Sequence, residues 1–412
     1  MTLIARVRAT AASTATAVLL TACGGGAASQ AADPVDAARW ETVLSQARGQ
    51  SVRWYMYGGD STLNSFVNGY VADRLAEQGV TLKQVRVQDT ADAVNKVLGE
   101  VQAGRTSGGG VDAVWVNGEN FATGVQAGLW SCGWAQDLPS AAYVDATDPA
   151  ISHDFGVPVE GCEAPWQQAS SALVYDSARL SARDVRSLAT LQDWVERHPG
   201  RFTYPAPPDF TGSMVVRTFL HDTPGSGALP DRPSESTYPP VAARLWSRLQ
   251  ALEPSLWRRG ETYPQTQAEV ERLYADGAVA AYFTYGPGAV GDLVAKGVFP
   301  ATTRQAVLAG GNVGNVSFVA IPSNAEHRAA ALVLADVLGE PRTQLELYRA
   351  EGVFPAVDLD TLGPALRAEF AAVPTHPSVL PLAELTRNVV PELSSSYVER
   401  LERDWTTRVL QR

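Results

Sequence analysis

The sequence predicts an α/β fold with mainly parallel sheets and helices on both faces. Runs of β-forming residues alternate with amphipathic helical patterns through the first third of the chain. The connections between these runs are only a few residues long, as expected of consecutive strand–helix–strand units. The chain has 412 residues, of which 45% are apolar, so it can bury a core in two or three domain-sized units.

Three strand–helix pairs begin the pattern. Each strand is rich in β-branched and aromatic residues, and each following helix repeats apolar residues at helical spacing behind a capping residue. Asp60 or Ser61 can cap the first helix, and Asp89 or Thr90 the second. The expected strands are 51–57, 80–87 and 111–116, and the third helix spans 119–127.

Polar and small residues follow the carboxyl end of each of these strands. They are found at 58–60, at 89–90 and at 117–120. In parallel sheets, ligands bind in the crevice beyond the carboxyl ends of the strands. These three segments are therefore the first candidates for a binding site.

The rest of the chain is less regular. Pro, Gly and Ser crowd residues 223–240 and indicate a surface excursion. The remaining residues after 338 are predicted to be mostly helical. The expected strands are 171–175, 278–285 and 315–321, and the expected helices are 187–197, 214–220, 241–252 and 326–338.

Charge and cysteine content exclude two classes of protein. The chain carries 33 lysines and arginines against 44 aspartates and glutamates, a formal net charge of −11, and has no basic cluster. An acidic surface repels phosphate, so nucleic acid is not an expected partner. Three cysteines are too few for a disulfide-dense scaffold.

The N-terminus has the pattern of an export signal. Arg6 and Arg8 precede an apolar stretch over 9–20 that is shorter than the ~20 residues of a membrane span. The order Leu-Thr-Ala-Cys at 20–23 resembles a bacterial lipobox. We therefore expect a signal peptide over 1–22, a lipidated Cys23 and a flexible leash over 23–39, which anchor an exported protein to a membrane in the periplasm or at the cell surface. An ordinary secretory signal with an incidental cysteine is the alternative.

Cys132 and Cys162 remain as a pair once Cys23 is assigned to the anchor. In an exported protein such a pair can form a disulfide. Two separate buried thiols are an equally open alternative.

Two motifs invite a catalytic interpretation. Gly59-Asp60-Ser61 resembles the start of Gly-Asp-Ser esterases, but none of the five histidines follows an aspartate by three residues. Without such a base Ser61 is a weak nucleophile. The G-x-G-x-x-G match at 286–291 lacks the acidic residue about 20 positions later that dinucleotide binding requires. No spacing of His or Cys indicates a metal site, so we expect neither enzyme activity nor a cofactor, with an esterase using Ser61 as the alternative.

Three stretches are similar to one known family. Residues 112–121 (DAVWVNGENF), 154–166 (DFGVPVEGCEAPW) and 198–212 (HPGRFTYPAPPDFTG) resemble the YnjB-like solute-binding proteins of ABC transporters. The resemblance implies a type II periplasmic-binding fold, with two lobes, crossing hinge strands and a ligand cleft between the lobes. It also implies an ABC permease and an ATPase as partners, and we expect a monomer.

The lobes are expected to interleave along the chain. Lobe 1 would take residues 40–154 and about 288–322. Lobe 2 would take 155–287 and about 323–412, including the C-terminal helices.

The predicted cleft combines strand-end loops of lobe 1 with polar and aromatic residues of lobe 2. Acidic and aromatic side chains there favour a small organic cation, such as a thiamine-like or polyamine molecule. A receptor of the same fold for an oxyanion or a metal is the alternative. The candidate ligand-binding residues are Tyr57, Gly58, Asp60, Asp89, Asn117, Glu119, Asn120, Glu163, Trp166, Tyr204, Phe210, Thr211 and Tyr285.

Overall fold

A six-stranded sheet forms the centre of lobe 1. The structure, a computed structural model, describes residues 35–230 and 232–411, so the expected signal peptide and Cys23 lie outside the described residues. Within this sheet β1 lies between β2 and β3 and runs parallel to both. These strands begin within two residues of their predicted starts, at β1 (Ser51–Tyr57), β2 (Thr81–Val87) and β3 (Ala113–Val116).

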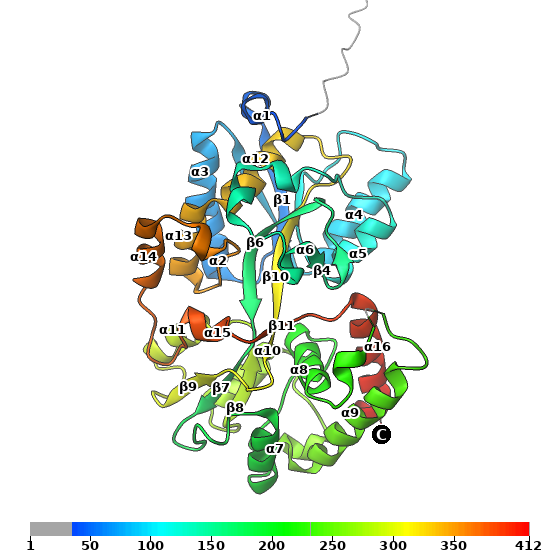
Figure 1. Ribbon diagram of the computed structural model, residues 1–412, viewed down its shortest axis with the longest axis vertical. Helices are drawn as coiled ribbons and strands as arrows, with labels where there is room; N and C mark the ends of the chain where they lie inside the picture. The colour runs from blue at the N-terminus through cyan, green and yellow to red at the C-terminus, as the bar shows by residue number, and fades with distance from the viewer. Residues whose placement is uncertain (1–34, 231, 412) are drawn as a thin grey trace, which may run out of the picture. The chain divides into compact units, whose positions relative to one another are not determined.

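Two long strands connect this sheet to lobe 2. β10 is antiparallel to both β3 and β6, and parallel to the short β11. β6 continues into β7, and β9 precedes β10, so the chain crosses between the lobes along two adjacent strands. Figure 1 shows β6 and β10 running from the upper to the lower part of the molecule. The bounds are β6 (Glu163–Ser170), β7 (Ala172–Asp176), β9 (Thr303–Ala306), β10 (Asn312–Ala320) and β11 (Val389–Pro391).

Lobe 2 contains a sheet of three strands. β7 pairs in antiparallel fashion with β9 and with β8 (Ala281–Thr284). The expectation of mainly parallel sheets therefore holds for β1–β3 but is wrong for lobe 2. The reason is that the second sheet is not built from consecutive strand–helix–strand units, which was the pattern that predicted parallel pairing.

The sequence pattern did not predict β6. The strand contains Pro165, which lacks a backbone donor and normally argues against an interior strand. The structure accommodates it at an irregularity in the pairing with β10, where Ser317 pairs with Gln167 and Phe318 with Pro165. Trp166 between them has no partner on β10, as in a β-bulge.

Helix α12 lies at the heart of lobe 1 and corrects the predicted division of the chain. Every residue from Ala329 to Gly339 is buried, as expected of a helix that is apolar all round. It packs against α1, β1 and β6 and shares a core with Val52 and Trp54 of β1. Residues 328–339 thus belong with lobe 1, where apolar contacts on all sides hold them, and not with lobe 2.

The opposite correction applies to residues 289–306. Val290 of α11 packs with Val174 and Tyr282 in a core of lobe 2, and β9 pairs with β7. This segment was expected in lobe 1. Its apolar residues instead cover the second sheet.

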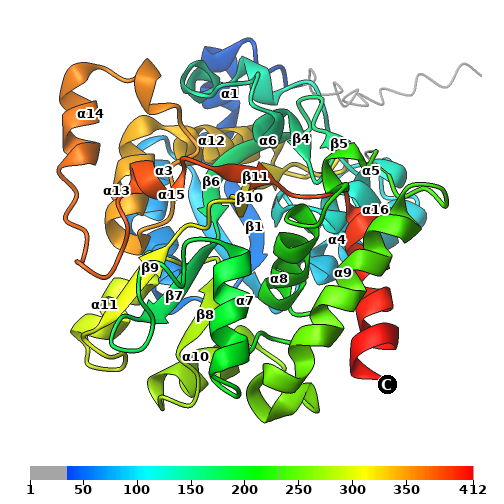
Figure 2. The ribbon, with the colours of Figure 1, turned by 60° about the horizontal axis from the view of Figure 1, so that its bottom comes forward.

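Helices cover the two sheets and form most of the C-terminal third. In Figure 2, α16 lies beside α8 and α9, although more than 140 residues separate it from α9 in the sequence. The lobe 1 helices are α1 (Trp40–Ala47), α2 (Ser61–Phe66), the π-helical η1 (Val67–Val71), α3 (Ala72–Glu77), α4 (Thr90–Gln102), α5 (Glu119–Gln126), α6 (Pro149–Ser152), α12 (Arg328–Gly339) and α13 (Pro341–Glu351). The others are α7 (Leu188–Arg197), α8 (Phe210–His221), α9 (Tyr238–Leu252), α10 (Gln267–Ala275), α11 (Ala289–Ala295), α14 (Pro364–Ala371), α15 (Leu382–Leu385), α16 (Ser395–Trp405) and the π-helical η8 (Thr406–Leu410).

Short connectors complete the chain. They include the hairpin of β4 (His153–Asp154) and β5 (Val157–Pro158). The 3-10 turns are η2 (Ala135–Asp137), η3 (Pro139–Tyr143), η4 (Ser226–Ala228), η5 (Glu253–Ser255), η6 (Trp257–Gly260) and η7 (Leu359–Thr361). Cys132 and Cys162 form a disulfide in the structure. Of the two alternatives left open by the sequence, a bonded pair or two separate thiols, the structure has the bonded pair. Over the described part of the chain, no helix has both the length and the apolar character needed to cross a membrane.

Candidate functional site

A cleft of about 520 Å³ opens at the carboxyl ends of β1, β2 and β3. Tyr57 is the last residue of β1, Asp89 follows β2, and Asn117 follows β3. Opposite them lie the N-terminal residues of α8 and one face of α16. The cleft therefore has walls from both lobes, at the sheet edge where parallel strands place their ligands.

Seven of the thirteen predicted ligand-binding residues line this cleft. They come from the strand-end loops of lobe 1 and from the start of α8. They are Tyr57, Asp89, Asn117, Glu119, Asn120, Phe210 and Thr211.

Helix caps hold several acidic side chains at the cleft. Asp89 caps α4 by accepting the N–H of Ala91 at 2.8 Å. Asp209 caps α8 in the same way, accepting the N–H of Thr211 at 3.0 Å and of Gly212 at 2.9 Å. Each aspartate is thus fixed at the mouth of a helix with one carboxylate face toward the backbone.

Two glutamates in the cleft have a raised pKa. Burial is the main cause at Glu119, and the negative charges of Glu399 and Asp89 add to it, while Arg217 opposes it. Burial also raises the pKa of Glu402, against a hydrogen bond with Ser213. Both carboxylates are therefore poorly compensated, and a cation placed between them would stabilise their charged forms.

Among the residues that the structure describes, Arg217 is the one basic residue that lines the cleft. Its guanidinium pairs with Glu392, Nε to Oε2 at 2.5 Å, and donates to Ser213 Oγ at 2.7 Å. The charge of Arg217 is thus already neutralised within the protein. Four carboxylates, of Asp89, Glu119, Asp209 and Glu402, remain around the cleft.

Aromatic side chains form the remaining walls. Tyr57 and Phe210 are 45% and 47% exposed, and both line the cleft. Trp115 and Phe155 also line the cleft. The ring of Phe210 packs on that of Tyr285 at 5.1 Å, which holds it at the cleft edge.

Three predicted residues are buried in cores and do not line the cleft. The ring of Trp166 meets those of Trp54 and Trp115 edge-on, at 5.4 and 5.0 Å. Tyr204 packs against Tyr263 and accepts a hydrogen bond from Trp405 Nε1. The prediction that they contact solute is corrected: their aromatic faces are used for packing. Glu163 is likewise buried on β6, away from the cleft lining.

The other three do not line the cleft and have structural roles. Gly58 donates its N–H to Val87 and continues the pairing of β1 with β2. Asp60 caps α2 by accepting the N–H groups of Thr62 and Leu63. The Tyr285 hydroxyl hydrogen-bonds to Glu392 behind the cleft wall. The cap at Asp60 also explains the Gly-Asp-Ser motif, because Ser61 is simply the first residue of α2.

Several cleft residues were missed by sequence reasoning. Trp115 lies within β3, where an aromatic residue is as typical of a core as of a cleft. Arg217 carried a usable signal, a lone arginine in an otherwise apolar helical stretch, whose burial requires a partner. No such signal marks the three cleft residues of α16, which are Ser395, Val398 and Glu402. This helix has the pattern of an ordinary surface helix and reaches the cleft only through its packing on α8.

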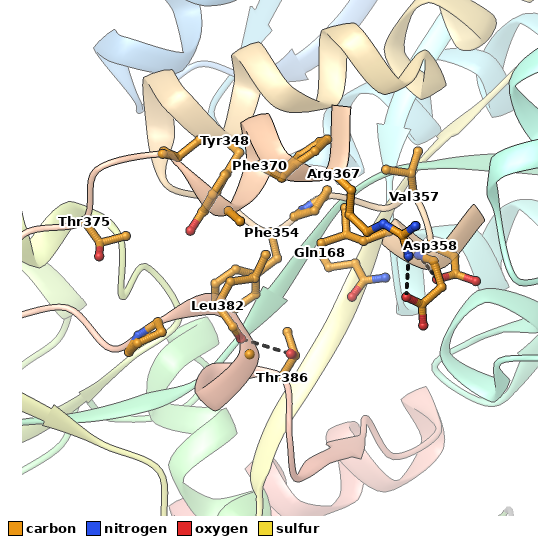
Figure 3. Close-up of a pocket in the computed structure, with 17 residues that line it drawn as sticks. Gln168, Tyr348, Phe354, Val357, Asp358, Arg367, Phe370, Thr375, Leu382 and Thr386 are labelled. Carbon is orange, nitrogen blue, oxygen red and sulfur yellow. Dashed lines mark hydrogen bonds and ion pairs between the residues drawn. The ribbon is translucent and has the colours of Figure 1, made fainter. Parts of the chain in front are cut away.

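A larger cavity, of about 600 Å³, lies elsewhere, between α13, α14 and the segment around α15. Figure 3 shows aromatic and aliphatic side chains such as Tyr348, Phe354, Phe370 and Leu382 around it. Its charged lining residues are Asp358, which is half-buried, and Asp360 and Arg367, which are exposed and pair with each other. This cavity lacks buried charged groups, so the strand-end cleft is the better candidate for a specific site. Among residues 35–230 and 232–411, no three His, Cys, Asp or Glu side chains are grouped to hold a metal ion.

Residues 69–359 match the model of the bacterial extracellular solute-binding protein family. The chain belongs to this family. Protein YnjB of Escherichia coli (strain K12) is 37% identical over 311 residues, which cover 75% of this chain and 79% of that protein. Family membership makes the chain an exported solute-binding component of an ABC transporter and not an enzyme, so the Ser61 esterase alternative is withdrawn.

Solved structures of solute-binding proteins share the fold. An ABC transporter protein from Clostridium perfringens superposes with a TM-score of 0.62 at 15% identity, covering 87% of this chain and 99% of that one. The spermidine/putrescine ABC transporter substrate-binding protein PotD from Streptococcus pneumoniae superposes with a TM-score of 0.58 at 12% identity, covering 87% and 99%. Together with the crossing strands β6 and β10, these likenesses establish the type II periplasmic-binding fold of this family member.

Proposed function

We propose that this solute-binding protein captures a small organic cation, of the polyamine or thiamine-like class, in the strand-end cleft and delivers it to an ABC permease. The observation that carries the proposal is the charge of the cleft. Four carboxylates line it, and its one guanidinium, on Arg217, is already paired with Glu392. A bound cation would gain from these carboxylates without having to break an internal ion pair.

The aromatic rings supply the second part of a cation site. Tyr57, Trp115, Phe155 and Phe210 present flat apolar surfaces to the cleft. Such faces attract ammonium groups and cover the methylene segments between them. The spermidine/putrescine protein among the solved structures agrees with this class of solute, although at 12% identity it supports only the fold.

An anionic solute fits the same cleft poorly. It would lie among Asp89, Glu119, Asp209 and Glu402, and like charges at such distances repel. Its only cationic partner would be Arg217, at the expense of the buried pair with Glu392.

Isothermal titration calorimetry on the purified chain tests the proposal. We expect spermidine, putrescine or thiamine to bind, and phosphate, sulfate and neutral sugars not to bind. Glu119→Gln should lower the affinity for the cation about 10-fold or more. Glu41→Gln, at an exposed position on α1, should leave that affinity unchanged. Binding of anions without binding of any cation would contradict the proposal.

We also propose that the protein is held at the membrane by lipid on Cys23, as a monomer, behind a leash that ends near residue 39. The support is the order of residues 20–23 and the apolar stretch before them. Labelling cells with a radioactive fatty acid tests this. The label should appear on the wild-type chain and be absent from Cys23→Ser, and equal labelling of both would exclude the anchor.

A further inference from the structure

A second cavity, of about 390 Å³, lies beside the cleft. We call it the side cavity, and its walls come from α6, the β4–β5 hairpin, β10 and the residues at the end of β11. Asp154, Phe155, Asn315 and Glu392 are among its lining residues. Nothing in the proposed capture of a cation by the cleft requires it.

Two residues that line the side cavity each carry a buried acceptor without a partner. Asp154 is 2% exposed, and its Oδ1 accepts the N–H of Gly118 at 2.8 Å, but its Oδ2 has no hydrogen-bond partner. Asn315 is 7% exposed, and its Oδ1 also has none. Unsatisfied buried acceptors are costly and rare in native proteins. A molecule that brings N–H donors into this cavity would satisfy both.

Acidic groups lie around the side cavity, and a positively charged donor would stabilise their ionised forms. Glu392 lines it with a side chain only 3% exposed, and its single ionic partner is Arg217 on the cleft side. Glu163 lies near Asp154 and has both carboxyl oxygens buried without a hydrogen-bond partner. His153, whose Nδ1 hydrogen-bonds to Ser152, is exposed, and no lysine or arginine lines the cavity.

The side cavity and the cleft share a wall. Phe155 lines both, and it adopts a φ of 44°, a conformation uncommon for a non-glycine residue. Gly118, which lines the cleft, holds Asp154 through its backbone N–H. Phe155 therefore stands between the side cavity and the cleft, and a ligand that occupies both must pass its ring.

We propose that the side cavity is a second subsite, which takes one ammonium group of an elongated diamine or polyamine whose other ammonium group occupies the cleft. This inference rests on the proposed function and specifies the length and charge spacing of the solute. A primary ammonium group has three donors, enough for both unpartnered acceptors. The subsite would select solutes with two separated cationic ends over those with one.

Paired amines test the subsite. Calorimetry compares 1,4-diaminobutane, 1,6-diaminohexane and 1,8-diaminooctane with the monoamines of the same length. We expect at least one diamine to bind about 10-fold more tightly than its monoamine or better, by the strength of one charge-assisted hydrogen bond. Asp154→Asn should remove most of this advantage and leave monoamine affinity within about twofold, whereas Glu119→Gln should weaken both.

A second variant and a crystal structure distinguish a loss of the subsite from a loss of folding. Asparagine at 154 keeps an oxygen for the Gly118 N–H, and Asn315→Leu removes the other acceptor without touching any charge. Both variants should unfold within a few degrees of wild type. A crystal structure with the best diamine should place a nitrogen within hydrogen-bond distance of Asp154 Oδ2.

The outcomes separate the two proposals. If diamines and monoamines bind equally, or if Asp154→Asn leaves diamine affinity unchanged while Glu119→Gln weakens it, the subsite is wrong and the cation cleft stands. If no amine or other cation binds the wild-type chain, the cation cleft fails and the subsite fails with it.

Discussion

Arg217 and Glu392 form an ion pair almost wholly withdrawn from solvent, with side chains 1% and 3% exposed and Nε 2.5 Å from Oε2. The two residues lie 175 positions apart, one on α8 and the other just after β11. The pair joins the wall of the cleft to the wall of the side cavity. The Glu392 carboxylate also accepts a hydrogen bond from the hydroxyl of Tyr285, so its partners come from two other parts of the chain.

Removing one partner of this pair should be strongly destabilising. Glu392→Gln leaves the buried guanidinium of Arg217 without a counter-charge, and such a change costs about 3–5 kcal/mol. Urea unfolding followed by fluorescence measures the loss. The double variant Arg217→Met, Glu392→Gln should recover part of it, since no charge is then left unpaired. A Glu392→Gln protein as stable as wild type would contradict the role of the pair.

Substitutions of Trp166 and Tyr57 should have opposite effects on stability and on solute binding. Trp166→Ala removes a ring packed between Trp54 and Trp115 and should cost about 3–5 kcal/mol of unfolding free energy. Tyr57→Ala removes an exposed cleft ring, so it should weaken solute binding with little loss of stability. Urea unfolding and calorimetry on both variants measure the contrast. If Trp166→Ala weakened solute binding without any loss of stability, the assignment of Trp166 to the core would be wrong.

The sequence could predict the lobe 1 wall of the cleft because one rule places it. Consecutive parallel strands end at the same sheet edge, so Tyr57, Asp89 and Asn117 were brought together from their positions alone. Asp60 and Asp89 could equally be recognised as caps from the residues that follow them. These features depend on contacts that are local in sequence or on one regular topology.

Long-range packing set the features that could not be predicted. Glu402 reaches the cleft only because α16 packs on α8, and nothing in its own helical pattern marks that face. Trp166 was assigned to the cleft as an aromatic residue of lobe 2, whereas β6, which was not predicted, carries it into the core. Residues 289–306 and 328–339 lie in the opposite lobes to those predicted for the same reason. The sequence of an apolar helix does not indicate which sheet the helix packs against.

The disulfide between Cys132 and Cys162 should contribute about 3–4 kcal/mol to stability, because it closes a loop between residues 30 positions apart. The double variant Cys132→Ser, Cys162→Ser should unfold at a lower temperature than wild type. A reducing agent should lower the unfolding temperature of wild type toward that of the variant and leave the variant unchanged. Equal sensitivity of the two proteins would show that the bond carries no stability.

Asp154 should make the folded chain less stable as the pH rises. Burial raises its pKa to about 7, against a hydrogen bond from Gly118 and with the help of the negative charge of Glu392. The unfolded carboxyl has its ordinary pKa of about 3.9. Between these two values the folded state holds a proton that the unfolded state releases, so the free energy of unfolding falls with increasing pH and levels off above about 7.

Asp154→Asn isolates this contribution from those of the other buried carboxyls. The amide cannot ionise, so the variant should lose less stability than wild type between pH 5 and pH 8, by up to about 3 kcal/mol. Urea unfolding at the two pH values measures both slopes. Glu41→Gln, on the exposed face of α1, should follow wild type. If Asp154→Asn and wild type lose the same stability over this range, the Asp154 carboxyl is not held protonated by its burial.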